Sequence, residues 1–143
     1  MTTTLLLGVG NTLRRDDAAG PVVVEGIADR PGCRRFIAHQ LLPEHADELA
    51  WCDRVVFVDA AVHADHVRIE RLMSSVSPPA LGHACDPAWL LGLCAALHDR
   101  APPAWLLTVP AFDLGFGEGL SEMSRAGIAV ATRMLSDWLD SID

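Results

Sequence analysis

Acidic side chains that could bind a cation follow two apolar segments of the sequence. Asp16 and Asp17 stand side by side after the run TLLLGVGN, and Asp59 ends the run RVVFVD. A carboxylate at the end of a buried strand is costly unless it is paired or coordinated. Two adjacent carboxylates also repel each other, and a nearby cation offsets that repulsion. These residues therefore suggest a cation site, although helix capping uses the same residue types.

His83 lies in the segment that precedes a helix starting after Asp86. If the two strand ends are neighbours, Asp17, Asp59 and His83 can converge above one edge of a sheet. Two carboxylates and an imidazole make a plausible site for a divalent transition metal with open coordination positions.

Other side chains could compete for a place in this site. Cys85 is a soft ligand two residues after His83, but thiolate sites usually contain more cysteines. His39 and His45 flank the second apolar segment and could face the same edge. His63 and His66 lie in a polar turn and are expected to be exposed.

Gly8 and Gly10 in LLLGVGNTLRRDDAAG match only the first two glycines of a nucleotide-binding loop. A dinucleotide fingerprint needs a third glycine, and Leu13 stands in its place; no G-K-[ST] follows either. The two carboxylates would also repel a pyrophosphate. We therefore expect Gly8 and Gly10 to form a tight turn that Asn11 cross-links through its amide.

Nucleophilic catalysis is the competing chemistry. The sequence contains no G-x-S-x-G elbow. Ser74, Ser75 and Ser77 lie near His83, and Asp59 could orient that histidine. A serine triad is conceivable there, but no motif fixes it.

The order of apolar and amphipathic segments predicts an α/β fold. We expect strands over residues 4–9, 34–42, 54–62, 66–73 and 104–112, the fourth being a half-exposed edge strand. Helices are expected from about Asp17 or Ala18 to RPG, and over 43–53, 86–100 and 121–142. Such alternation gives a mostly parallel sheet of about five strands with helices on both faces, in one domain over 1–143. Ligands of such sheets bind at the carboxyl ends of the strands, near the switch point in strand order.

Composition excludes several classes of function. The formal net charge is −8 and the chain has no lysine, which excludes Schiff-base and P-loop lysines. An acidic chain without a basic run is not expected to bind nucleic acid. No apolar run approaches the roughly 20 residues of a membrane span, and the start of the chain lacks a signal-peptide pattern, so we expect a cytoplasmic protein. The four cysteines form no C-x-x-C pair and are expected to be reduced.

Four blocks of the sequence together resemble the [NiFe]-hydrogenase maturation endopeptidases. The blocks keep the order found in that family and are spread over nearly the whole chain: LLLGVGNTLRRDDAAGPVVVEGI, VVFVDA, GHACDPAWLLGL and VPAFDLGFGEGLS. The resemblance implies a three-layer sandwich with a twisted sheet between helices. It also implies a peptidase that removes the C-terminal extension of the nickel-loaded hydrogenase large-subunit precursor.

The resemblance carries residue roles to three positions. Asp17, Asp59 and His83 match the family's metal-binding and catalytic residues, with nickel supplied by the precursor and another divalent metal possible in the isolated protein. The metal could polarise the scissile carbonyl and activate water, or serve mainly as a recognition anchor. Asp16 and Asn11 are candidates for a supporting role, with Asp16 expected to cap its helix rather than act as a general base through water. The precursor is the expected partner, and we expect a monomer.

One departure from the family pattern bears on substrate choice. Several members carry Asp-Gly-Gly-Thr or a similar segment after the second strand, whereas this chain has HQLLPEHADEL over 39–49. Whether His39, Gln40 or Glu44 takes part in recognition stays open. Two further alternatives remain: a non-enzymatic nickel-dependent maturation chaperone, and a small-molecule amidohydrolase on the same scaffold.

Overall fold

The structure is a computed structural model, and it describes residues 2–75 and 85–142. Its elements follow the predicted order of strands and helices. The strands are β1 Thr4–Val9, β2 Cys33–Ala38, β3 Arg54–Ala61, β4 Arg68–Leu72 and β5 Ala104–Pro110. The α-helices are α1 Ala19–Gly26, α2 Ala46–Ala50, α3 Pro87–His98 and α4 Glu122–Ser141; two 3₁₀ turns, η1 Arg15–Ala18 and η2 Pro43–His45, precede α1 and α2.

The five strands form one sheet in the order β2-β1-β3-β5-β4. β2, β1, β3 and β5 are parallel to their neighbours, and β4 pairs antiparallel with β5 at the edge. The chain leaves β1 toward β2 and then returns to β3 on the other side of β1. The strand order therefore reverses between β1 and β3, so the switch point lies between the carboxyl ends of these two strands.

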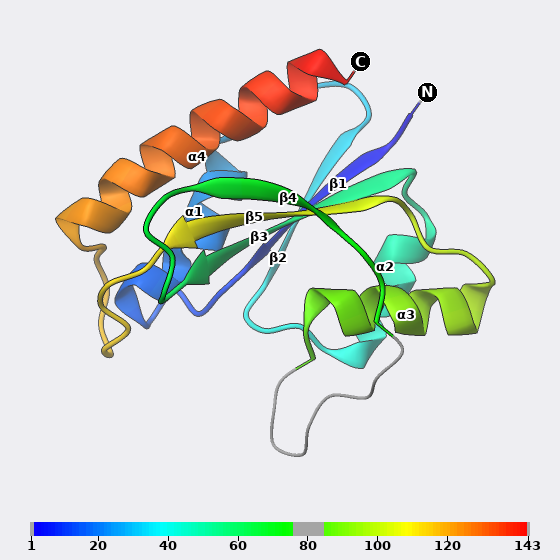
Figure 1. The fold of residues 1–143 in the computed structure, drawn as a ribbon, viewed down its shortest axis with the longest axis horizontal. Coiled ribbons are helices and arrows are strands. Elements are labelled where there is room, and N and C mark those ends of the chain that lie inside the picture. The colour runs from blue at the N-terminus through cyan, green and yellow to red at the C-terminus, as the bar shows by residue number, and fades with distance from the viewer. Residues whose placement is uncertain (1, 76–84, 143) are drawn as a thin grey trace.

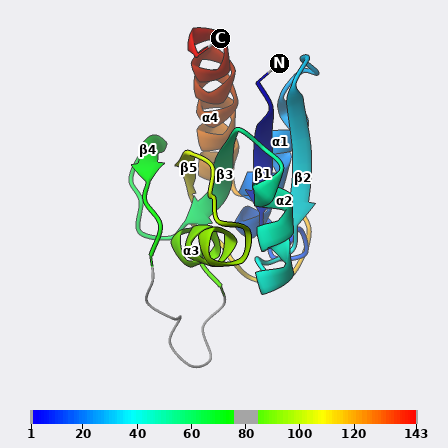
Figure 2. The same ribbon diagram turned by 90° about the vertical axis from the view of Figure 1, so that its right-hand side faces the viewer.

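Helices cover both faces of the sheet, as the sequence predicted (Figures 1 and 2). α1 and α4 pack on one face over Leu6, Val56 and Val58, while α2 and α3 pack on the other over Leu5, Leu7 and Phe57. Successive residues of β1 and β3 thus enter opposite cores, which explains why both segments read as continuous apolar runs. The predicted three-layer α/β fold is confirmed.

Several expected element boundaries and faces are wrong in detail. α1 ends at Gly26, because Ile27 turns extended (φ −77°, ψ 129°) and buries its side chain instead of continuing the helix toward RPG. β2 ends at Ala38, so residues 39–42 form a loop rather than the end of a strand. The helical spacing of apolar residues would place Leu97 of α3 and Val130 of α4 on buried faces, but both side chains are exposed.

Helix starts agree better with the sequence. Asp86 caps α3 by accepting a hydrogen bond from Trp89 N–H (2.8 Å), and Ser121 Oγ accepts from Ser124 N–H (3.2 Å) at the start of α4. All four cysteines are reduced, outside any disulfide. Among residues 2–75 and 85–142, no helix has both the length and the hydropathy of a membrane span.

Candidate functional site

Two glycines allow the segment after β1 to return tightly against the sheet. A Cβ on Gly10 would lie 1.9 Å from the carbonyl oxygen of Asp17, and a Cβ on Gly20 would lie 2.2 Å from that of Val58. Only glycine permits backbones to approach this closely. Gly8 belongs to β1, where it is paired with Val58, so it is not part of the turn.

The loop between β1 and η1 holds the carboxylate of Asp17 in place. Asp17 Oδ2 accepts a hydrogen bond from Asn11 N–H (2.7 Å), and Asn11 Oδ1 accepts one from Leu13 N–H (2.9 Å). The second contact is the predicted cross-link of the turn by the Asn11 side chain. The chain therefore uses Asn11 to fix both the turn and the acid that follows it.

Asp59 lies near the end of β3, one residue beyond the Gly8–Val58 pair of the β1–β3 ladder. Burial raises the pKa of Asp59 to about 7; a hydrogen bond from Ala60 N–H to Oδ1 (2.8 Å) opposes this rise, and the charge of Asp17 adds to it. The charge of Asp17 is thus close enough to affect the ionisation of Asp59. Among the described residues, neither is in an ion pair.

Asp17 and Asp59 line the same cleft, which has a volume of about 380 Å³. Its other walls come from the end of β1, the loop after β2 and the start of α3: Val9, Gly10, His39, Gln40, Leu41, Cys85, Asp86 and Pro87. The cleft lies at the carboxyl ends of the strands, at the switch point, as expected for this class of sheet.

The structure does not test the predicted three-residue ligand set, because His83 lies outside the described residues. Within 2–75 and 85–142, no group of three or more His, Cys, Asp and Glu side chains could hold a metal ion. The two carboxylates themselves are chemically suited to a divalent cation, because a cation would offset both the burial of Asp59 and its repulsion by Asp17. The assignment of Asp17, Asp59 and His83 as ligands stays a prediction.

Asp16 has a role that the sequence did not reveal. Its side chain is fully buried and does not cap η1 or α1. Instead, Oδ2 accepts hydrogen bonds from Phe112 N–H, Asp113 N–H and Ser121 O–H, and Oδ1 accepts one from Ser121 N–H, all within 2.7–2.9 Å. The expectation of a local helix cap is therefore wrong: Asp16 satisfies backbone donors of a distant loop.

These hydrogen bonds outweigh the effect of burial on Asp16. Burial alone would raise the pKa of this carboxyl, but the donors of Ser121, Phe112 and Asp113 lower it below its usual value. The negative form is thus the one that the fold stabilises. No local spacing could have shown this, since the donors lie 96 or more residues away along the chain.

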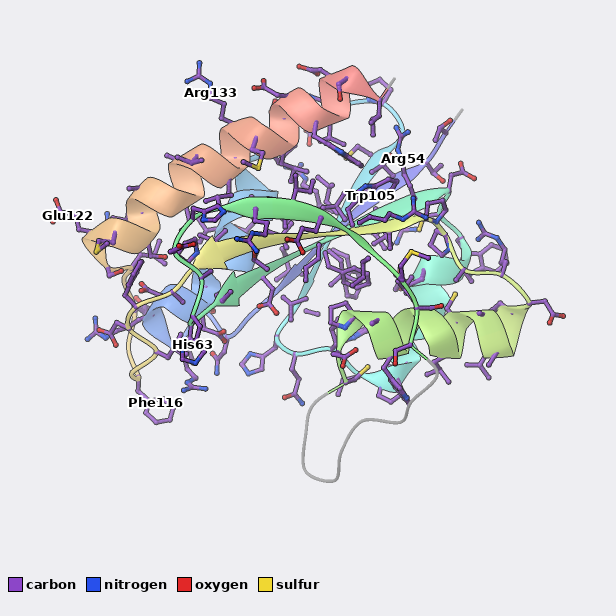
Figure 3. All side chains as sticks on the ribbon, in the orientation of Figure 1. Arg54, His63, Trp105, Phe116, Glu122 and Arg133 are labelled. Carbon is purple, nitrogen blue, oxygen red and sulfur yellow. The ribbon has the colours of Figure 1, made fainter. Side chains whose placement is uncertain are left out.

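The remaining candidates from the sequence lie in varied surroundings. His39 is exposed and lines the cleft, whereas His45 Nδ1 accepts a hydrogen bond from Leu42 N–H (2.9 Å) and its ring packs edge-on against Phe36. His63 and His66 are exposed, as predicted, and Figure 3 shows His63 at the sheet end where β3 finishes. The proposed serine triad cannot be placed, because His83 and Ser77 lie outside the described residues.

Sequence comparison gives no match to a family model, and no curated protein matches the chain. Structural comparison does give similar proteins. The hydrogenase maturating endopeptidase HybD from Escherichia coli superposes with a TM-score of 0.78 at 23% identity, covering 98% of this chain and 93% of that one. The [NiFe] hydrogenase maturation protease HycI from Thermococcus kodakarensis gives a TM-score of 0.75 at 20% identity, with 97% and 93% covered. HybD from Thermococcus kodakarensis gives 0.72 at 19% identity, covering 96% and 99%. Over nearly its whole length, the chain has the fold of these hydrogenase maturation endopeptidases.

Proposed function

We propose that this protein is an endopeptidase that removes the C-terminal extension of a nickel-loaded [NiFe]-hydrogenase large-subunit precursor. The observation that carries the proposal is the pairing of Asp17 and Asp59 on one cleft at the switch point of the sheet, without an ion-pair partner among the described residues. The shared fold and the four sequence blocks support the same reading. Fold alone does not determine chemistry, so the proposal depends on the site.

Asp17 and Asp59 are proposed to bind the nickel that the precursor already carries, with His83 as the third ligand. The cation offsets the repulsion between the two carboxylates, so binding is favoured only when the precursor brings its metal. This makes nickel part of the substrate and couples cleavage to completed nickel insertion. An empty precursor lacks the group that these acids are arranged to hold.

The reaction is hydrolysis of one peptide bond. Water adds to the scissile carbonyl, the C–N bond breaks, and the leaving nitrogen takes a proton, so the products are a carboxylate and an amine. The residues of this chain hold the metal-bearing end of the substrate beside the bond. Asn11 keeps Asp17 in position through its backbone N–H.

The shape of the cleft suits a peptide segment. Its volume of about 380 Å³ lies near the lower end of the range for small-ligand pockets, and its walls come from five separate stretches of the chain. The loop after β2, in which His39 and Gln40 are exposed and Leu41 is buried, forms one of these walls. We propose that this loop contacts the residues that flank the scissile bond.

Mass spectrometry of the precursor tests this function directly. Nickel-loaded large-subunit precursors from the organism that encodes this chain are incubated with the protein, and a shortened product is expected. Asp17→Asn, Asp59→Asn and His83→Ala should each abolish processing. Asp29→Asn is the matched control, because its carboxylate is exposed and pairs with Arg35 away from the cleft.

Two results would contradict the proposal. If no precursor is shortened while a known maturation protease processes its own precursor in parallel, the protein is not this endopeptidase. If the precursor binds in a nickel-dependent way without being cleaved, the protein is a maturation chaperone. A variant that keeps full activity would remove its residue from the site.

A further inference from the structure

Asp17 lies in η1, directly after the tight turn that residues 11–14 form beyond β1. Arg14 N–H donates to Asn11 C=O, and Asp17 N–H donates to Arg14 C=O, both at 3.0 Å. These local hydrogen bonds fix the shape of the turn. The direction in which the turn carries Asp17 depends on its contacts with the rest of the fold.

The loop between β5 and α4, residues 111–121, supplies such contacts. Figure 1 shows this loop beside the segment that joins β1 to α1. Gly117 N–H donates to Leu13 C=O (2.8 Å), and Arg15 N–H donates to Gly117 C=O (3.1 Å). Among the described residues that line the cleft, none belongs to this loop. The loop therefore holds the turn from outside the cleft.

The buried carboxylate of Asp16 joins the same two segments through its side chain. Oδ2 accepts hydrogen bonds from Phe112 N–H, Asp113 N–H and Ser121 O–H, and Oδ1 accepts one from Ser121 N–H. The backbone N–H of Asp16 also donates to Asp113 C=O (2.9 Å). Hydrogen bonds to a carboxylate are short and charge-assisted, so these donors together define one orientation of Asp16.

The orientation of Asp16 determines the orientation of Asp17. Both belong to one 3₁₀ turn, in which three residues complete a turn and successive side chains point roughly 120° apart. Asp16 points into the loop between β5 and α4, and Asp17 lines the cleft. A rotation of η1 that moved Asp17 would break the hydrogen bonds of Asp16.

The backbone directly before Asp16 is strained. Arg15 has a left-handed φ of 46°, which a residue with a side chain adopts only where surrounding contacts impose it. These contacts are its own hydrogen bond to Gly117 and the hydrogen bonds of Asp16. The fold therefore holds η1 in an orientation that the local backbone alone does not favour.

We propose that Asp16 and Ser121 position the carboxylate of Asp17 in the cleft. Asp16 acts through η1 and Ser121 acts through Asp16, so both are positioning residues without contact to the substrate. The inference deepens the proposed function and rests on it, because Asp17 is the residue proposed to bind the nickel of the precursor. It gives the buried charge of Asp16 a role in the site in addition to its role in stability.

The backbone amide of Asn11 reports the position of Asp17 without metal or precursor, because it donates to Asp17 Oδ2 (2.7 Å). In ¹H–¹⁵N spectra of the full chain, Asp16→Asn should shift the Asn11 amide proton upfield, as loss of this hydrogen bond does. Asp113→Asn is the matched control in the same loop, because its side chain is half-exposed. It should leave the Asn11 resonance in place.

Ser121 provides a second test that does not depend on whether Asp16→Asn folds. Ser121→Ala removes the hydroxyl that donates to Asp16 Oδ2 and keeps the backbone N–H that donates to Oδ1. The Asn11 resonance should therefore shift in the same direction by a smaller amount. Ser121→Thr retains the hydroxyl and should restore the original resonance.

Kinetics of precursor processing separate positioning from a loss of stability. Asp16→Asn should raise KM for the nickel-loaded precursor about tenfold, because a displaced Asp17 binds the nickel less well. Leu139→Ala is the control for stability, since Leu139 is buried at the far end of α4 from Ser121. Its loss of folded protein should lower the apparent kcat and leave KM unchanged.

The amide resonance and KM give distinguishable outcomes. If the Asn11 resonance stays in place in Asp16→Asn and Ser121→Ala, positioning is wrong, whatever the protein cleaves. If the resonance shifts but the precursor is processed with an unchanged KM, positioning is also overturned. If the unaltered protein processes no precursor, the proposed function fails; a shifted Asn11 resonance then still supports the positioning of Asp17, and an unshifted one overturns it.

Discussion

Asp16 and Asp17 are neighbours in sequence with opposite environments. Asp16 is surrounded by donors from the loop between β5 and α4, so its charge is already satisfied inside the fold. Asp17 receives one backbone hydrogen bond and faces the cleft, where Asp59 is also negative when ionised. One acid therefore stabilises the protein, and the other leaves negative charge available to a ligand.

Asp16→Asn tests the structural role of the first acid. The amide would place N–H groups opposite backbone donors, so we expect the free energy of unfolding to fall by about 3 kcal/mol. Urea unfolding measures this change, with Asp113→Asn as a control in the same loop, where the side chain is half-exposed. Asp113→Asn should change stability by less than about 1 kcal/mol. Equal losses in the two variants would contradict the anchoring role.

Asp59 should make the metal-free protein less stable as pH rises. Its pKa is about 7 in the folded state, against 3.8 for an unperturbed aspartate, so the folded state holds a proton that the unfolded state releases. Stability contributed by the neutral form is present below about pH 4 and is lost as pH rises to about 7. The loss amounts to about 2–4 kcal/mol.

Asp59→Asn keeps the shape of the neutral acid and removes its titration. With a chelator present, the unfolding free energy of the variant should gain about 2–4 kcal/mol relative to the original protein between pH 5 and pH 8. Urea unfolding at the two pH values measures the difference. A constant difference across this range would show that Asp59 ionises normally in the fold.

At the scale of elements, α1 positions the site through its first turn. Gly20 lies against the carbonyl oxygens of Val58 and Val9, where a Cβ would approach to 2.2 and 2.7 Å. These atoms belong to β3 and β1, and backbone cannot move aside as a side chain tip can. The start of α1 is therefore set by the two strands whose ends carry the acidic residues.

Gly20→Ala should displace α1 and lower the free energy of unfolding by about 3 kcal/mol, with loss of processing as Asp17 shifts. Gly26→Ala is a control in the same helix, because its Cβ would lie 3.7 Å from Thr132 Cγ2, an ordinary contact. Alanine there should raise stability by about 0.5 kcal/mol through helix propensity. Thermal unfolding measures the change in stability, and the mass-spectrometric assay measures the change in processing. If Gly20→Ala changes neither, the close packing of Gly20 against β1 and β3 is refuted.

Element types were predictable from the sequence because they depend on local signals. The continuous apolar run of β3 and the caps Asp86 and Ser121 act within a few residues, and the structure contains all of them. Element ends were less predictable, because they depend on tertiary contacts. α1 stops at Gly26 since Ile27 gains more by burial in the core than by another helical turn.

At the scale of the whole molecule, topology determined which acids meet. Asp17 and Asp59 are 42 positions apart in the sequence. Asp17 follows β1 and Asp59 lies near the end of β3, and these two strands flank the switch point. The alternation of strands and helices in the sequence already implied that the two acids lie at the same edge of the sheet. The anchoring of the loop between β5 and α4 by Asp16 could not be inferred in that way. It joins two loops at opposite ends of the chain, and neither loop has a periodic pattern.

Divalent metal should stabilise the whole protein through the cleft. A ligand that binds only the folded state adds about 2.7 kcal/mol to the free energy of unfolding when its concentration is 100 times its dissociation constant. For a chain of this length, this raises Tm by roughly 5–10 °C. We expect this rise with Ni²⁺ alone at pH 8, and a smaller one at pH 6, because a proton then competes for Asp59.

The variants identify where the metal binds. Asp17→Asn, Asp59→Asn and His83→Ala should each remove most of the Ni²⁺-dependent rise in Tm, whereas Asp29→Asn should keep it in full. Differential scanning fluorimetry gives the Tm of every variant with Ni²⁺ and with a chelator instead. A rise in Tm that survives in Asp17→Asn and Asp59→Asn would place the metal elsewhere, on the cysteines or the exposed histidines. No rise at pH 8 would mean that the cleft has no affinity for the cation by itself, so that nickel could be held only together with ligands from the precursor.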